Sequence, residues 1–107
     1  MFVAVYRWHL RPELEQDFVA HWRRITELGL GAGSGGSSLF KDADGCWVAM
    51  ARWPSRDTRA RFFAQLADDA VDPALGERAR QAIVERFPDQ ELESVLDLWC
   101  SLPGAVA

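Results

Sequence analysis

A chain of 107 residues with 49% hydrophobic and 26% charged residues is long and apolar enough to bury one core, so we expect a single domain over residues 1–107. This composition excludes the disordered class. The balance of 12 basic and 16 acidic residues gives a formal net charge of -4 and an isoelectric point near 5.1. Such a charge repels polyanions, so nucleic acid and anionic membranes are not expected partners.

The start of the chain, Met1 to His9, has neither a basic leader nor a long apolar run. We therefore expect no signal peptide, no membrane span and a cytoplasmic location. The two cysteines, Cys46 and Cys100, are too few for a disulfide framework and have no metal-ligand spacing. Two free thiols are expected.

The first predicted element is a strand over residues 2–10, rich in aromatic and β-branched side chains. Alternation puts two sets on opposite faces: Phe2, Ala4, Tyr6 and Trp8 on one, and Val3, Val5, Arg7 and His9 on the other. Because both faces carry apolar side chains, the strand should be covered on both sides.

The second element is a helix that opens at Arg11-Pro12-Glu13, since proline suits a first helical turn and the acids that follow favour the positive end of the helix dipole. Apolar residues recur in it at helical spacing: Leu14, Phe18, Trp22, Ile25 and Leu28. This stripe should pack on the sheet. The glycine-rich stretch 29–37 should stop the helix and form a mobile loop.

A β-hairpin is predicted next, with strands over residues 38–41 and 46–53 around an acidic turn that ends at Gly45. One face of its second strand carries Trp47, Ala49, Ala51 and Trp53. The other face carries Cys46, Val48, Met50 and Arg52.

Two helical pieces follow, each with its own start signal. The first is capped near Ser55 and carries Phe62, Phe63, Leu66 and Ala70. The second starts at Asp72-Pro73, carries Leu75, Ala79, Ala82, Ile83 and Phe87 on one side, and ends at Pro88 and Asp89. A last strand over residues 91–100 and a small tail at Pro103-Gly104 complete the chain.

This order of elements predicts an α+β, ferredoxin-like β-α-β-β-α-β fold with an antiparallel sheet and helices on one face. In the usual strand order for this topology, the third and fourth strands flank the first, which puts Cys46 and Cys100 at opposite ends of the sheet and excludes a disulfide between them. The open face would display Val3, Val5, Val48, Met50, Val95 and Trp99. Pairing two copies sheet to sheet would bury this patch, so a homodimer is expected.

The opening run Phe2 to Trp8 and the run Asp44 to Ser55 resemble the antibiotic biosynthesis monooxygenase (ABM) family. The resemblance implies a dimeric α/β barrel with an apolar pocket between sheet and helices, where cofactor-independent members oxidise electron-rich polycyclic phenols with molecular oxygen. Trp53 matches the tryptophan that ends the family's third strand and lines this pocket. Oxygenases of the family carry an asparagine four residues before it and a tyrosine six residues after it, where this chain has Ala49 and Arg59.

Two residues are the predicted catalytic candidates. His21 lies on the flank of the buried helical stripe, where a histidine of near-neutral pKa could act as a base. The alternative is a partly buried structural histidine. Trp53 would position the substrate.

Aromatic and cationic side chains supply the predicted substrate contacts: Tyr6, Trp8, Trp22, Trp47, Arg59 and Phe62. The rings could stack on an aromatic ligand, and Arg59 could bind an anion. The alternative for the rings is core packing, and the alternative for the arginine is exposure to solvent. His9 is expected on the opposite face, so the two histidines form no metal site, and we expect no metal and no cofactor.

These observations leave two functional hypotheses. The first is a cofactor-independent monooxygenase that acts on a small aromatic or polyketide- or quinol-like metabolite. The second is a non-catalytic dimer of the same fold that binds a small ligand or serves in protein interaction. An RNA-recognition module has a similar element order, but the acidic charge and the missing basic, glycine and aromatic strand motif argue against it.

Overall fold

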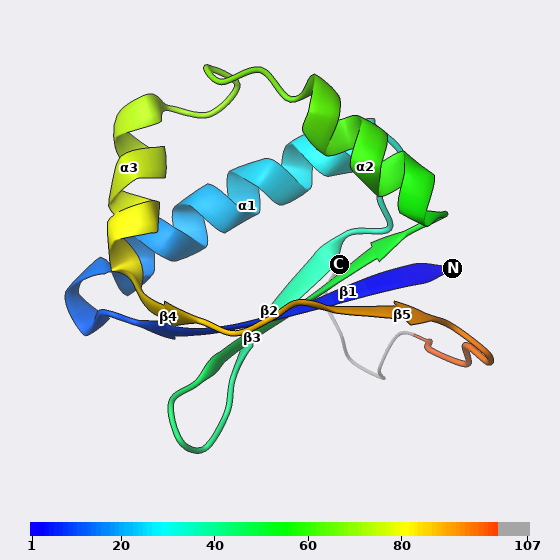
Figure 1. The fold of residues 1–107 in the computed structure, drawn as a ribbon, viewed down its shortest axis with the longest axis horizontal. Coiled ribbons are helices and arrows are strands. Elements are labelled where there is room, and N and C mark those ends of the chain that lie inside the picture. Colours follow the sequence, from blue (N-terminus) through cyan, green and yellow to red (C-terminus); the bar gives the residue numbers. More distant parts are fainter. Residues whose placement is uncertain (101–107) are drawn as a thin grey trace.

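The computed structural model describes residues 1–100; the predicted tail at Pro103-Gly104 lies outside them. Its elements follow the predicted order, with one strand more: β1 Phe2–Leu10, η1 Pro12–Leu14, α1 Glu15–Gly31, β2 Ser37–Lys41, β3 Trp47–Trp53, α2 Arg56–Gln65, α3 Pro73–Ala82, β4 Ile83–Arg86 and β5 Gln90–Glu93. The α+β, ferredoxin-like prediction is confirmed. All three α-helices of the described chain lie on one face of the sheet (Figure 1).

The sheet is built around β1. Its strand order is β2-β3-β1-β4, with β5 also paired to β1, and every pairing is antiparallel. β1 is thus flanked by β3 on one side and by β4 and β5 on the other, as predicted. The register sets Phe2 opposite Trp53, Tyr6 opposite Ala49 and Trp8 opposite Trp47. The even-numbered residues of β1 and the odd-numbered residues of β3 therefore point to the helices.

The core lies between this face and the helices. The four helix-facing residues of β1 are at most 6% exposed, and Phe18 of α1 and Phe62 of α2 close over them at 5% and 9%. The other residues of the predicted α1 stripe, Leu14, Trp22, Ile25 and Leu28, are partly buried against the same cluster.

The glycine-rich stretch differs from its prediction. α1 continues through Gly29 and ends at Gly31, so the connection to β2 is shorter than the expected loop. Gly29 is buried, and a Cβ built on it would lie 3.5 Å from the Trp53 ring. Gly35 donates its N–H to the carbonyl of Arg52 at 2.7 Å and so lies against β3. These glycines serve close packing as well as the turn.

The second half also corrects the prediction. Ser55 caps α2, and Asp72 caps α3 by accepting the N–H of Ala74 at 3.0 Å, as expected. However, α2 ends before Leu66 and Ala70, and α3 ends at Ala82. Ile83 begins β4, and the predicted last strand over 91–100 ends at Glu93. The chain changes from helix to strand at the β-branched pair Ile83-Val84. Backbone pairing with β1 outweighs the apolar spacing from which we predicted a helix as far as Phe87.

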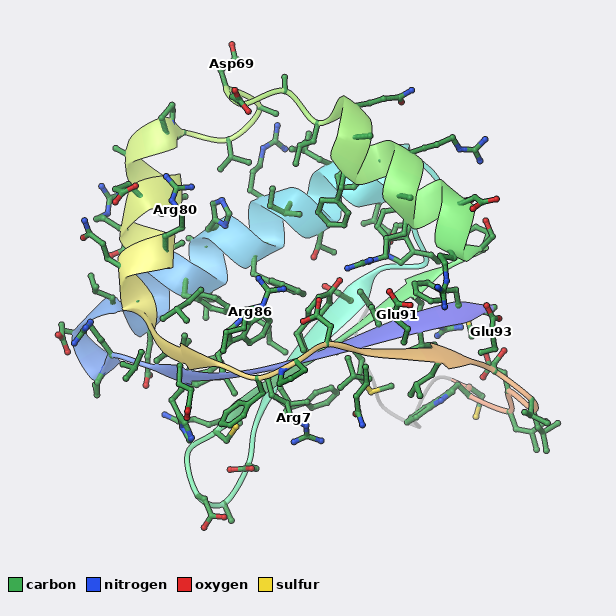
Figure 2. The ribbon with its side chains drawn as sticks, in the orientation of Figure 1. Arg7, Asp69, Arg80, Arg86, Glu91 and Glu93 are labelled. Carbon is green, nitrogen blue, oxygen red and sulfur yellow. The ribbon has the colours of Figure 1, made fainter. Side chains whose placement is uncertain are left out.

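The face opposite the helices is less open than predicted. Val3 and Val5 are 9% and 8% exposed, so the expectation that both are displayed is wrong. Arg52 crosses this face, where its Nη2 pairs with Asp97 at 3.2 Å and its Nε contacts the sulfur of Met1 at 3.3 Å. Val48 and Met50 are partly buried, while Val95 and Trp99 are 100% and 81% exposed. Arg7 points away from the helices on this side (Figure 2).

Both cysteines are free thiols, as predicted. Within residues 1–100, no helix has the length and apolarity needed to cross a membrane.

The close contacts of Gly29 and Gly35 predict opposite effects of alanine. Gly29→Ala adds a Cβ at ordinary contact distance, 3.4 Å from Ser34 and 3.5 Å from Trp53, and removes a glycine from a helix. We expect it to raise the free energy of unfolding by about 0.5–1 kcal/mol. Gly35→Ala adds a Cβ 3.1 Å and 3.3 Å from Arg52 Cβ and the Arg52 carbonyl oxygen. It should lower stability by about 1–3 kcal/mol.

Urea unfolding of the two variants measures this difference. Equal destabilisation by both would show that Gly29 is also required for its small size.

Candidate functional site

A cavity of about 920 Å³ lies between the sheet and the helices. Its walls come from β1, β3, β4, the start of β2, all three α-helices, and the segments that follow α1 and α2. Figure 1 shows the same arrangement, with α1 above the sheet and α2 and α3 at its two ends. This volume is in the range of small-molecule sites.

Most of the predicted site residues line this one cavity. They are Tyr6, Trp8, His21, Trp22, Trp53, Arg59 and Phe62. Trp47 is not among the lining residues. It packs edge-on against Phe18, with the ammonium of Lys41 5.3 Å from its ring centroid, so it belongs to the core and not to the expected ligand contacts.

An aromatic wall forms one part of the lining. Tyr6 and Trp8 stack with ring centroids 5.7 Å apart and planes 8° from parallel. Trp22 of α1 meets both rings edge-on, at 5.4 Å and 5.3 Å. These are favourable geometries for aromatic pairs, and they hold the rings in fixed positions.

Trp53 forms a second aromatic wall with α2. Its ring lies 5.3 Å from Phe62 and 6.3 Å from Phe63. Its indole N–H is fully buried and has no acceptor among the described residues. Trp53 therefore offers the cavity its ring surface and not a hydrogen bond.

Tyr6 and Arg59 form the most direct polar pair in the cavity. Arg59 donates to the Tyr6 hydroxyl from Nε at 3.1 Å and from Nη2 at 2.6 Å. Burial raises the pKa of Tyr6 above its ordinary value, although the Arg59 guanidinium acts in the opposite direction. The tyrosine therefore stays a neutral phenol at neutral pH, with a proton to donate.

His21 reaches the cavity from α1 at its contact with α3. A Cβ at the buried Gly76 would lie 3.5 Å from His21 Nε2, so the small residue lets the helix approach the ring. Burial, and next the charge of Arg80, lower the pKa of His21. A neutral imidazole that lines a cavity can accept a proton. No hydrogen bond to this ring occurs within residues 1–100.

The sequence did not single out a small polar group at the edge of the cavity. Trp22 Nε1 donates to Ser37 Oγ at 2.9 Å, and Thr26 Oγ1 lies 2.6 Å from the same oxygen. Thr26 follows Trp22 by one helical turn, and this spacing alone predicts that the two side chains lie side by side. Ser37 could not be located because it lies in the stretch that we expected to be loop. Phe63, which we placed only on the helix, also lines the cavity.

In the described part of the chain, no three His, Cys, Asp or Glu side chains are grouped so that they could hold a metal ion.

Comparison with known structures identifies close matches in fold. The protein Rv0793 from Mycobacterium tuberculosis superposes with a TM-score of 0.69 at 14% identity, covering 92% of this chain and 98% of that one. A protein from Nitrosomonas europaea with a provisional antibiotic biosynthesis monooxygenase name gives 0.69 at 13% identity, covering 90% and 100%. SnoaB, a cofactor-independent oxygenase from Streptomyces nogalater, gives 0.67 at 16%, covering 91% and 95%.

This chain has the fold of the antibiotic biosynthesis monooxygenases. The resemblance drawn from its two sequence runs is thus supported by structure. No family model matches the sequence, and a comparison with curated proteins gives no match either.

The two positions where the resemblance leads us to expect an asparagine and a tyrosine lie in different places. Arg59, at the tyrosine position, lines the cavity, whereas Ala49, at the asparagine position, is fully buried under it and is not among the lining residues. Arg59 therefore contributes directly to the chemistry of the cavity, and Ala49 does not.

The lowered pKa of His21 predicts a pH-dependent stability. Because the folded state disfavours the charged imidazole, the unfolded chain protonates first as the pH falls. The contribution of neutral His21 to the free energy of unfolding is fully present above about pH 6.5, the pKa of the unfolded chain. It is lost as the pH falls through the lower pKa of the folded state. His21→Gln should remove this contribution. The free energy of unfolding of the variant should therefore fall less between about pH 7 and pH 5 than that of the unchanged protein.

Urea unfolding at both pH values measures the difference, with His9→Gln as control because that side chain is 47% exposed on the other face. If the unchanged protein and His21→Gln lose the same stability, the assigned shift is wrong.

Proposed function

We propose that this protein is a cofactor-independent monooxygenase that oxidises a small aromatic or quinol-like metabolite with molecular oxygen. The observation that carries this proposal is the cavity itself. It combines two aromatic walls, a histidine of lowered pKa and a protonated tyrosine held by an arginine. The fold is shared with SnoaB, whose name states a cofactor-independent oxygenase. The proposal takes residues 1–107 as one domain located in the cytoplasm.

The reaction that fits these groups starts with proton removal from a methylene carbon between aromatic rings. His21 takes the proton, and the carbanion passes electrons to oxygen and forms a C–O bond as a peroxide anion. The imidazolium returns the proton to give a hydroperoxide. Loss of the second C–H proton together with hydroxide leaves a ketone and one water, so that RCH₂R′ and O₂ give RC(=O)R′ and H₂O.

The other residues have supporting roles in this reaction. Trp8, Trp22, Trp53 and Phe62 hold the flat substrate by ring contacts and keep water away from the carbanion. The Tyr6 hydroxyl and the Arg59 guanidinium stabilise negative charge that spreads onto a substrate oxygen.

Oxygen consumption with a panel of anthrones and quinols tests the proposal. We expect uptake with at least one compound, and a fall in kcat of about 100- to 10,000-fold in His21→Gln, which loses the base. His9→Gln is the matched control and should keep the full rate. Absence of uptake across the panel, or an unchanged rate in His21→Gln, would contradict the mechanism.

We also propose that two copies pair through the face opposite the helices. Val48 and Met50 are partly buried there, and Phe40 and Leu92 are 51% and 48% exposed. This face carries no helix in the described chain (Figure 1). A stable interface of standard size buries about 1,200–2,000 Å² in total.

Met50→Glu should convert a dimer to a monomer, because it puts a charge at the centre of this surface. Size-exclusion chromatography with light scattering measures the mass. Ala20→Glu, which makes the same change at an exposed position on α1, should leave the dimer intact. A monomeric unchanged protein at micromolar concentration would refute the interface.

A second candidate function is ligand binding without turnover. It is favoured by the absence of the asparagine and tyrosine that oxygenases of the family carry at positions 49 and 59. Quenching of tryptophan fluorescence by the same panel without oxygen uptake would select this alternative.

A further inference from the structure

We propose that the cavity selects an aromatic ligand that carries a carboxylate, held by Arg59 and the Tyr6 hydroxyl. This inference rests on the proposed function only in taking the cavity as the ligand site. It specifies the chemical class of the ligand and does not require turnover.

The first argument is the charge of Arg59. Three arginines line the cavity, and two of them are neutralised. Arg80 pairs with Glu77 at 2.8 Å, and Arg86 pairs with Asp89 at 3.1 Å. Arg59 has no carboxylate partner within residues 1–100, and its side chain is bonded only to the phenol of Tyr6. It is therefore the cation of the lining that still lacks a counterion.

The second argument is the direction of the remaining donors. Nε and Nη2 of Arg59 both donate to the Tyr6 oxygen. Because a guanidinium has no acceptor, the phenolic proton cannot be directed back at Arg59. Nη1 makes no hydrogen bond in the described chain. The pair thus retains a phenolic O–H and a guanidinium edge for an outside acceptor.

The third argument is the surroundings of the guanidinium. Its central carbon lies 5.6 Å from the ring centroid of Tyr6 and 5.4 Å from that of Phe63. These rings hold its plane in place and reduce its contact with water, so a bound anion is screened less than at an open surface. The neutral phenol of Tyr6 and the neutral His21 supply no competing negative charge.

The acidic residues of the lining do not supply the missing counterion. Asp72 is engaged in capping α3, and Asp69 points out of the molecule (Figure 2). Asp68 lies beside it in the exposed segment between the helices. Asp89, whose charge acts on Tyr6, is already paired with Arg86.

A carboxylate on an aromatic ring fits these features together. Arginine binds the two oxygens of a planar carboxylate through its fork of N–H groups, and the phenolic O–H can donate to the same group. The ring system of such a ligand would contact the stack of Tyr6, Trp8 and Trp22.

Binding of two matched probes tests the inference. Anthraquinone-2-carboxylate and anthraquinone-2-carboxamide have the same rings and differ in charge, and both are already oxidised, so neither needs turnover. By calorimetry or tryptophan quenching at about pH 7.5, where the acid is ionised, we expect the carboxylate to bind about 10- to 100-fold more tightly. Arg59→Gln should abolish this preference, and Tyr6→Phe should reduce it about 3- to 10-fold while keeping carboxamide binding.

Arg61→Gln is the matched control, since it removes the same charge from the exposed side of the same helix, outside the cavity. It should leave the preference unchanged. Circular dichroism and carboxamide affinity show that each variant still folds and binds rings. Equal affinity for the two probes, or a preference that survives Arg59→Gln or is lost equally in Arg61→Gln, would overturn the inference.

The outcome is separable from that of the proposed function. A preference for the carboxylate without oxygen uptake on any substrate would remove the oxygenase and keep the anion site. Oxygen uptake with an equal affinity for the two probes would do the reverse.

Discussion

The pairing of β1 with strands on both of its edges is the constraint on which the rest of the structure depends. β3 lies on one side, and β4 and β5 lie on the other. A strand held this way cannot rotate or slip by one residue without turning Phe2, Ala4, Tyr6 and Trp8 away from the helices. Since this set is at most 6% exposed, such a slip would transfer the largest side chains of the core to the other face.

The same constraint positions the cavity. β1 supplies Tyr6 and Trp8, its neighbour β3 supplies Trp53, and the helices that cover them add His21 and Arg59. Rings fixed on strands are rigid, and the imidazole of His21 and the guanidinium of Arg59 come from helices that pack on those rings. A site of this kind has a permanent aromatic surface, and its chemistry is altered by single substitutions on α1 and α2, such as the arginine at position 59.

Charge compensation separates Arg59 from Arg80 and Arg86, the other two arginines that line the cavity. Arg52, Arg56, Arg78, Arg80 and Arg86 each have an acidic partner within 4.0 Å. Most of these pairs are solvent-exposed, so they add little stability, but they leave those arginines with their charge matched. Within residues 1–100 Arg59 is bonded only to a neutral phenol, and it lines a cavity where a bound anion would complete the pairing.

The sequence by itself determined β1, the stripe of α1, the β2–β3 hairpin and both helix caps, because alternation, helical spacing and capping residues act over a few positions. It also indicated His21, Tyr6, Trp53 and Arg59 as site residues. Only the tertiary structure decided that α1 continues through Gly29, because Gly29 packs against Trp53, which lies on β3. It also decided that Ile83 leaves the helix, because Ile83 pairs with β1. Trp47 and Trp53 lie on the same face of β3, so the alternation pattern does not distinguish them. Only packing in three dimensions decided that Trp53 lines the cavity and Trp47 does not.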